Sequence, residues 1–140
     1  MYVWDNSLTG YGNAAVSGIK FAYSSGYGYS PTITWLGSGT FDFSGAYFMA
    51  NGPHTVRFFG YNNGIKVYDT GNIGISQYNP SWITFNWTGI DEIRTSHVGG
   101  VDSWPMDDFT YTASVTVSVA VWLLGSGLIG IVGARRKFKK

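Results

Sequence analysis

The chain has 140 residues, which is enough for one domain of modest size and a short appendage. Aromatic residues make up 18% of the chain and glycines number 20, a composition that favours strands and turns; with no cysteine, disulfides, thiolate metal sites and thiol nucleophiles are excluded. The net charge of +1 hides an asymmetry, because the first 134 residues carry four basic and eight acidic side chains. This part of the chain is therefore mildly acidic, which argues against nucleic acid as its partner.

The N-terminal segment, Met1 to Gly10, has neither the charged n-region nor the apolar h-region of a signal peptide. Because the C-terminal segment described below requires export, we expect a signal peptide encoded upstream of Met1, together with an additional first strand.

Residues 11 to 112 show short runs of alternating apolar and polar residues separated by turn residues, a pattern that predicts strands. Asn63-Gly64 is the clearest turn, since both residues tolerate the positive φ of a tight hairpin. No segment before the tail has the periodicity of an amphipathic helix, so we expect an all-β sandwich or barrel. The predicted strands are Ala15–Tyr23, Thr32–Leu36, Thr40–Phe43, Ala46–Ala50, Thr55–Tyr61, Ile65–Asp69, Ser81–Trp87, Glu92–Thr95 and Met106–Tyr111.

Catalytic chemistry finds little support in the sequence. His54 and His97 are the two imidazoles, and each lies beside turn residues. The acidic doublets 91–92 and 107–108 cannot each supply two converging carboxylates, because neighbours on a strand point to opposite faces. A pair formed across two strands is left open, but we expect no enzyme activity.

Aromatic residues in loops are candidates for stacking on a sugar, because pyranose CH faces pack on aromatic rings. Tyr27 and Tyr29 lie in a Gly/Ser-rich stretch, and Trp104 lies near a second loop. The favoured interpretation is still that these rings belong to the core or to an ordinary surface.

The C-terminal segment from Val115 to Ala134 contains twenty residues and no charged side chain. At about 1.5 Å per residue, a helix of this length covers about 30 Å, the hydrocarbon thickness of a bilayer. Five basic residues lie among the last six, as expected for a cytoplasmic end that leaves the body outside. A buried terminal strand over Val115–Val119 with a basic tail is the alternative. We therefore predict an ectodomain over 1–112, a transmembrane helix over 113–134 and a cytoplasmic tail over 135–140.

The stretch Ala120-Val-Trp-Leu-Leu-Gly-Ser-Gly-Leu-Ile-Gly-Ile-Val-Gly-Ala-Arg-Arg-Lys137 resembles the PEP-CTERM sorting signal of Gram-negative bacteria that make exopolysaccharide. The resemblance implies export, recognition by an exosortase-type membrane enzyme and removal of the tail. The family has a Pro-containing motif where this chain reads Val115-Thr116-Val117-Ser118-Val119, so an anchored precursor and a variant processing signal are both open. The residues that carry the expected sorting and anchoring function are Val115, Val119, Trp122, Leu123, Leu124, Gly125, Ser126, Gly127, Gly130, Gly133, Arg135, Arg136 and Lys137.

The body resembles the ectodomain common in PEP-CTERM proteins, a jelly-roll sandwich similar to galactose-binding-like and carbohydrate-binding modules. The resemblance spans about 75 residues in four stretches: 40–48, 56–61, 83–93 and the closing Met-Asp-Asp-Phe-Thr-Tyr of 106–111. It implies that Asp107 binds calcium, a cation that takes six to eight oxygen ligands, with a solvated or hydrogen-bonded surface acid as the alternative. The candidate additional ligands of such a site are Asp5, Asn6, Asp102 and Asp108.

These resemblances imply an exported cell-surface or matrix protein, sorted with exopolysaccharide, that has a structural or adhesive role. The alternative is a carbohydrate-binding module with a defined glycan pocket. The precursor is expected in the inner membrane with its body outside, and a processed form on the cell surface or secreted.

Overall fold

The computed structural model describes residues 2–5, 13–24, 30–50, 52, 54–98 and 103–114, with the backbone alone described for 2–5. Within these residues the secondary structure consists of strands, and no helix is long and apolar enough to cross a bilayer. The strands are β1 (Tyr2–Asp5), β2 (Lys20–Ser24), β3 (Thr32–Thr34), β4 (Thr40–Phe48), β5 (His54–Asn62), β6 (Ile65–Ile75), β7 (Ser81–Ile90), β8 (Glu92–His97) and β9 (Trp104–Ser114).

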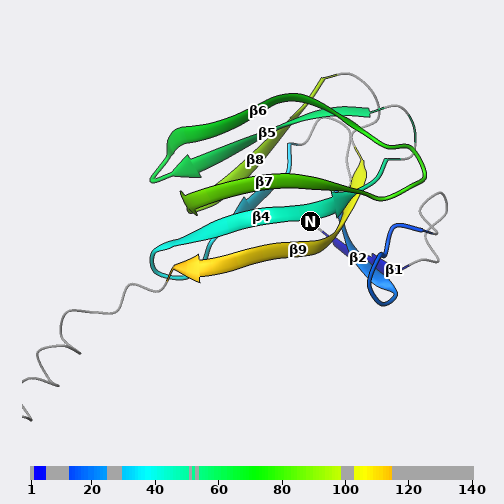
Figure 1. Cartoon of the computed structure of the whole chain (residues 1–140), viewed down its shortest axis with the longest axis horizontal. Helices are drawn as coiled ribbons and strands as arrows, with labels where there is room; N and C mark the ends of the chain where they lie inside the picture. Colours follow the sequence, from blue (N-terminus) through cyan, green and yellow to red (C-terminus); the bar gives the residue numbers. More distant parts are fainter. Residues whose placement is uncertain are drawn as a thin grey trace, which may run out of the picture.

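The strands form two antiparallel sheets (Figure 1). Sheet A has the order β1-β2-β9-β4-β7, and sheet B has the order β3-β8-β5-β6. The prediction of an all-β fold is confirmed for the described residues.

The core lies between the two sheets and is rich in aromatic side chains. On sheet A, Phe43 packs between Phe85 of β7 at 4.6 Å and Phe109 of β9 at 4.5 Å, the latter ring nearly parallel at 17°. From sheet B, Phe58 meets Phe85 edge-on at 5.0 Å. In β5 the side chains alternate between buried and half-buried positions from His54 to Gly60, as expected for a strand with one face on a core.

A β-bulge at Asp108 sets which residues of β9 point inward. Asp108 has a φ of 51°, and two residues of β9, Asp108 and Phe109, face the single residue Ala46 of β4 at this point. The bulge shifts the alternation by one residue, so that Met106 and Phe109 both reach the core. In this closing strand Phe109 stacks on Phe43, and Tyr111 lies edge-on to Phe41 at 6.2 Å.

The strand boundaries differ from the predicted ones where local features interrupt or extend the pattern. The run 40–43 and the first three residues of the run 46–50 belong to one continuous β4, which ends at Phe48, because a bulge at Ser44 changes the alternation without ending the strand. The turn at Asn63-Gly64 is confirmed, with φ angles of 49° and 75°. The strand predicted over 15–23 begins only at Lys20. β9 runs to Ser114, so two residues assigned to the predicted transmembrane helix are strand.

The placement of Trp104 in a loop is wrong. Trp104 is the first residue of β9 and is 0% exposed. Its ring contacts Phe48 at 5.5 Å and Phe58 at 6.1 Å, so it fills the space between the sheets. A ring with no exposed face cannot stack on a sugar, and Trp104 is a core residue.

Replacing Trp104 therefore affects stability. We expect Trp104→Ala to lower the free energy of unfolding by about 3–5 kcal/mol because it leaves a large cavity. Trp104→Phe should cost clearly less, since it keeps most of the ring and removes an Nε1–H donor that has no acceptor among the described residues. Urea denaturation followed by circular dichroism measures both; equal stability of Trp104→Ala and the parent chain would contradict the buried position.

Candidate functional site

The outer face of sheet A carries a row of three side chains from three neighbouring strands. Tyr47 of β4 pairs with Trp82 of β7 on one side and with Asp107 of β9 on the other. Residues directly opposite one another in an antiparallel sheet lie on the same face. The row therefore runs from an indole through a phenol to a carboxylate across the sheet.

The Trp82 ring lies across Gly45 and is fixed in that position. Its Nε1–H donates a hydrogen bond of 2.9 Å to Thr84 Oγ1, and its ring meets Tyr47 edge-on at 5.2 Å. A Cβ atom on Gly45 would lie 2.6 Å from the ring, so the absence of a side chain there makes room for the indole. With 40% of its surface exposed, Trp82 offers a flat ring that is already oriented.

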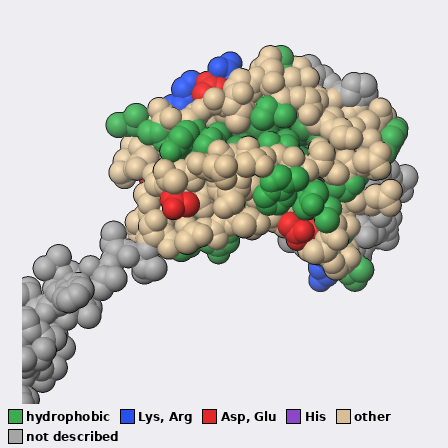
Figure 2. Space-filling model, in the orientation of Figure 1, with side chains coloured by type: hydrophobic (Ala, Val, Ile, Leu, Met, Phe, Trp, Pro, Cys, Tyr) green, Lys and Arg blue, Asp and Glu red, His purple; other side chains and the backbone are tan. Residues whose placement is uncertain are grey.

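Polar side chains lie on both sides of Gly45, across which this ring lies. Gly45 pairs with Thr84 on one side and with Thr110 on the other, which forms a second row beside the first. Figure 2 shows a hydrophobic patch over β4 and β7 with acidic side chains next to it over β9. We refer to this surface as the Trp82 face; its residues are Gly45, Tyr47, Trp82, Thr84, Asp107 and Thr110.

Asp107 and Asp108 attach the segment before β2 to the sheet. Asp107 Oδ2 accepts hydrogen bonds from the backbone N–H groups of Val16 at 2.7 Å and Ser17 at 2.9 Å. The Ser17 hydroxyl donates to Asp108 Oδ1. Asp107 is thus a hydrogen-bonded surface acid, one of the two alternatives that the sequence left open.

Calcium binding by Asp107 stays a prediction. Among the described residues no three His, Asp or Glu side chains lie close enough together to hold a metal ion. Of the four candidate additional ligands, Asp108 lies beside Asp107, whereas Asn6, Asp102 and the side chain of Asp5 lie outside the described residues.

A shallow hollow adjoins Asp107 where β2 diverges from β9. It has a volume of about 230 Å³ and is lined by the following residues: Lys20, Phe21, Ala22, Met106, Asp107, Asp108 and Phe109. This is below the ~300–1,000 Å³ of typical small-molecule pockets. The surface suits a ligand that lies across it better than one that it would enclose.

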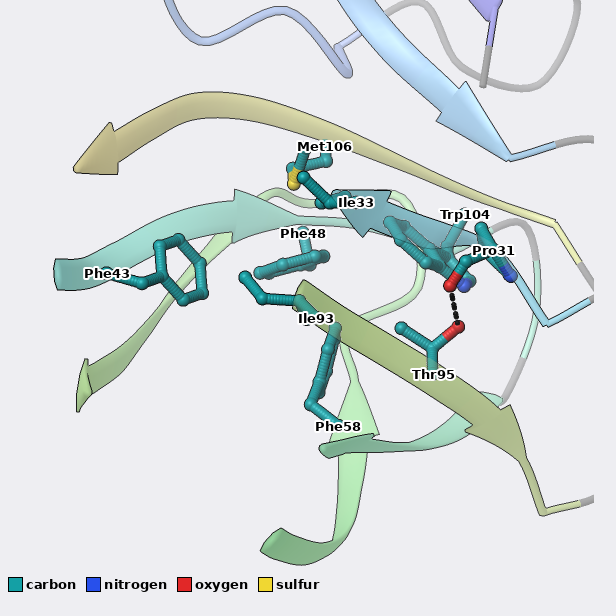
Figure 3. Close-up of a pocket in the computed structure, with 9 residues that line it drawn as sticks. All are labelled: Pro31, Ile33, Phe43, Phe48, Phe58, Ile93, Thr95, Trp104 and Met106. Atoms are coloured by element: carbon teal, nitrogen blue, oxygen red, sulfur yellow. Dashed lines mark hydrogen bonds between the residues drawn. The ribbon is translucent and has the colours of Figure 1, made fainter. Parts of the chain in front are cut away.

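Among the described residues, a much smaller cavity lies in the interior. One cavity between the sheets has a volume of about 10 Å³, which is room for a single water molecule at most. Figure 3 shows its mostly apolar lining, in which Thr95 donates a 3.1 Å hydrogen bond to the Pro31 carbonyl. We interpret this cavity as a packing gap in the core.

The outer face of sheet B carries charged side chains that are already paired with one another. Arg57 donates two hydrogen bonds to Asp69, at 2.6 and 2.7 Å, and Lys66 donates a third at 3.0 Å. The guanidinium of Arg57 holds the pKa of Asp69 well below its usual range, with further contributions from Gly71 N–H and Lys66. Arg94 makes a similar two-bond pair with Glu92 and lowers the pKa of that carboxyl.

The two histidines meet at the end of sheet B where β5 begins and β8 ends. His54 Nε2 lies 3.1 Å from His97 Nδ1, and His54 is buried. No pattern in the sequence indicates this contact, because the two residues are 43 positions apart. Within the described residues, the contact joins two imidazoles and contains no nucleophile.

The remaining predicted site residues belong to other parts of the chain. Tyr27, Tyr29 and the sorting and anchoring residues between 115 and 137 lie outside the described residues. Trp82 was recognisable in the sequence only as an aromatic residue near a loop. The alternation of Trp82, Thr84, Asn86 and Thr88 with apolar residues marks them as one outward face, but the strand register is needed to bring Tyr47 and Asp107 beside it.

Comparisons with known proteins give no relative for this chain. No protein-family model, curated protein or solved structure matches it.

The packing of the Trp82 ring against Gly45 can be tested by substituting Gly45. In Gly45→Ala the added Cβ would lie 2.5 Å from the Ile83 carbonyl oxygen and 2.6 Å from the indole, so the ring must move or the strands must separate. We expect a loss of about 1–3 kcal/mol in the free energy of unfolding and a changed Trp82 environment. Gly74→Ala is the matched control, because a Cβ at Gly74 meets nothing within 4 Å. Equal effects of the two substitutions in urea denaturation would contradict the packing.

The Asp69 cluster predicts a pH-dependent contribution to stability. Because the pKa of Asp69 is lowered in the folded state, its contribution is present above the unfolded-state pKa of about 4 and is lost as the pH falls through the folded-state value. Asp69→Asn should therefore lower the melting temperature at pH 7, and its difference from the parent chain should shrink toward pH 2. A difference that is constant over this range, measured by thermal denaturation, would show that the charge is not responsible.

Proposed function

We propose that the chain is an exported bacterial surface protein whose β domain contacts matrix polysaccharide through the Trp82 face. The observation that carries the proposal is the exposed Trp82 ring, which is held across Gly45 by Thr84 and Tyr47. The proposed role is structural or adhesive, without catalysis.

The chemistry of the face fits a glycan. A sugar ring presents CH groups on one side and hydroxyls at its rim, so it stacks on an aromatic face while nearby polar groups bond to its edge. Trp82 supplies the face, and the hydroxyls of Thr84 and Thr110 and the Asp107 carboxylate lie around it. Because the indole is already oriented, binding need not order it, which favours affinity.

The shape of the face supports contact with a polymer in preference to an enclosed glycan pocket. The described residues offer a flat row of side chains and a shallow hollow beside it, and an extended polysaccharide can lie across both. This favours the structural or adhesive role over a carbohydrate-binding module with a defined pocket.

We further propose that the β domain is a jelly roll. The strand pairs β2·β9, β3·β8, β4·β7 and β5·β6 are nested inside one another, as if one long hairpin had been rolled up into two sheets. This order supports the resemblance to jelly-roll ectodomains and carbohydrate-binding modules.

The location that we propose rests on the C-terminal sequence. Twenty uncharged residues followed by five basic ones support a membrane anchor with the body outside, and the Trp-Leu-Leu-Gly-Ser-Gly core supports recognition by an exosortase-type enzyme. The precursor is then an inner-membrane protein, and a processed form is a surface or secreted protein of the exopolysaccharide matrix.

Binding of the full chain, in detergent micelles, to purified exopolysaccharide tests the proposal. Trp82→Ala should reduce binding at least tenfold by removing the stacking face, while Trp82→Phe should retain part of it. Val67→Ala is the control, because Val67 is exposed on β6 of the other sheet.

Two results would contradict the proposal. Undiminished binding by Trp82→Ala would remove the Trp82 face as the site. Loss of binding in Tyr27→Ala or Tyr29→Ala, with Trp82→Ala unaffected, would place the site on the loop aromatics instead.

A further inference from the structure

At one end of the domain, several connections between strands lie beside the end of β9, from which the chain continues toward its C-terminus. Asn63 N–H donates to Asp91 Oδ2 at 2.7 Å, and Trp35 N–H donates to the Asp91 carbonyl at 2.8 Å. These bonds join the β5–β6 hairpin, the β3–β4 loop and the β7–β8 turn. β9 ends at the same end, because Ser114 pairs with Thr40 at the start of β4 (Figure 1). We refer to this part of the molecule as the exit end.

The exit end exposes large apolar side chains at two opposite corners. Leu36 in the β3–β4 loop is 96% exposed, and Ile65 at the start of β6 is 68% exposed. β3 and β6 are the two edge strands of sheet B, so these side chains lie at opposite sides of the sheet. Tyr111 on β9 adds a half-exposed ring on the sheet A side.

The length of the C-terminal segment indicates how far this end lies from a bilayer. If Val115–Ala134 crosses the membrane, its twenty residues at about 1.5 Å each occupy the full ~30 Å of the hydrocarbon layer. Ser114, the last residue of β9, precedes this stretch directly, so no residue is left over for a linker. The end of β9 must then lie at the headgroup level.

We infer that the exit end rests on the outer surface of the bilayer, with Leu36 and Ile65 inserted among the headgroups and Tyr111 at the interface. Exposed apolar side chains lose contact with water there, and tyrosine is enriched at membrane interfaces. This inference rests on the membrane anchor proposed above.

The geometry places the Trp82 ring away from the membrane. β7 runs from Ser81 toward the exit end, where it finishes at Ile90. Trp82 lies eight positions before Ile90, which corresponds to about 26 Å of extended strand. A protein standing on its exit end would hold the Trp82 ring out toward the matrix.

Single-cysteine labelling tests the inference directly, because the chain contains no cysteine. The full chain is reconstituted in vesicles of phosphatidylethanolamine and phosphatidylglycerol, with a fluorophore at one introduced cysteine and a quencher on the lipid headgroups. Leu36→Cys and Ile65→Cys should be quenched at least twofold more than Val98→Cys. Val98 is the matched control because it is exposed and follows β8, which begins at the exit end and runs away from it.

Labelling at a fourth position distinguishes a failure of this inference from a failure of the proposed membrane anchor. Leu128→Cys is measured with a quencher on the lipid acyl chains. If Leu128→Cys is quenched while positions 36, 65 and 98 behave alike, the anchor stands and the inference is wrong. If Leu128→Cys is not quenched, both the anchor and the docking of the exit end are wrong.

Discussion

The structure depends on the stack of aromatic rings that joins the three central strands of sheet A. Phe43 of β4 lies between Phe85 of β7 and Phe109 of β9, with ring centres 4.6 and 4.5 Å apart. No disulfide supports the fold, since the chain has no cysteine. These rings also hold the register, because a slip of one residue would turn every inward side chain of a strand outward. The outer row of Trp82, Tyr47 and Asp107 exists only in that register.

β-Bulges make this arrangement possible because they change which residues of a strand face the core and which face outward. The positive φ of Asp108 turns both Met106 and Phe109 inward and leaves Asp107 on the outer face, where it accepts the backbone N–H groups of Val16 and Ser17. One local distortion therefore serves the core, the Trp82 face and the attachment of the N-terminal segment.

The sequence predicted the class of fold and most strand positions, because alternation and turn residues are local signals. It left open whether Trp104 is buried, since the glycine, aspartate and serine before it and the proline after it resemble a loop. It did not predict the contact of His54 with His97 or the row of Trp82, Tyr47 and Asp107, because these depend on pairing between distant strands. Alternation shows which residues share a face of one strand; only the register shows what lies beside them.

In our proposal, a face that binds glycan is held away from the bilayer by a domain end that stands on the membrane surface. Glycan binding at this face is tested most directly by the indole N–H signals of the six tryptophans in an NMR spectrum of the full chain, with Trp82 assigned from Trp82→Phe. Addition of exopolysaccharide should shift the Trp82 signal and leave that of the buried Trp104 unchanged. An unshifted Trp82 signal under conditions where the protein is bound to the polysaccharide would contradict the account.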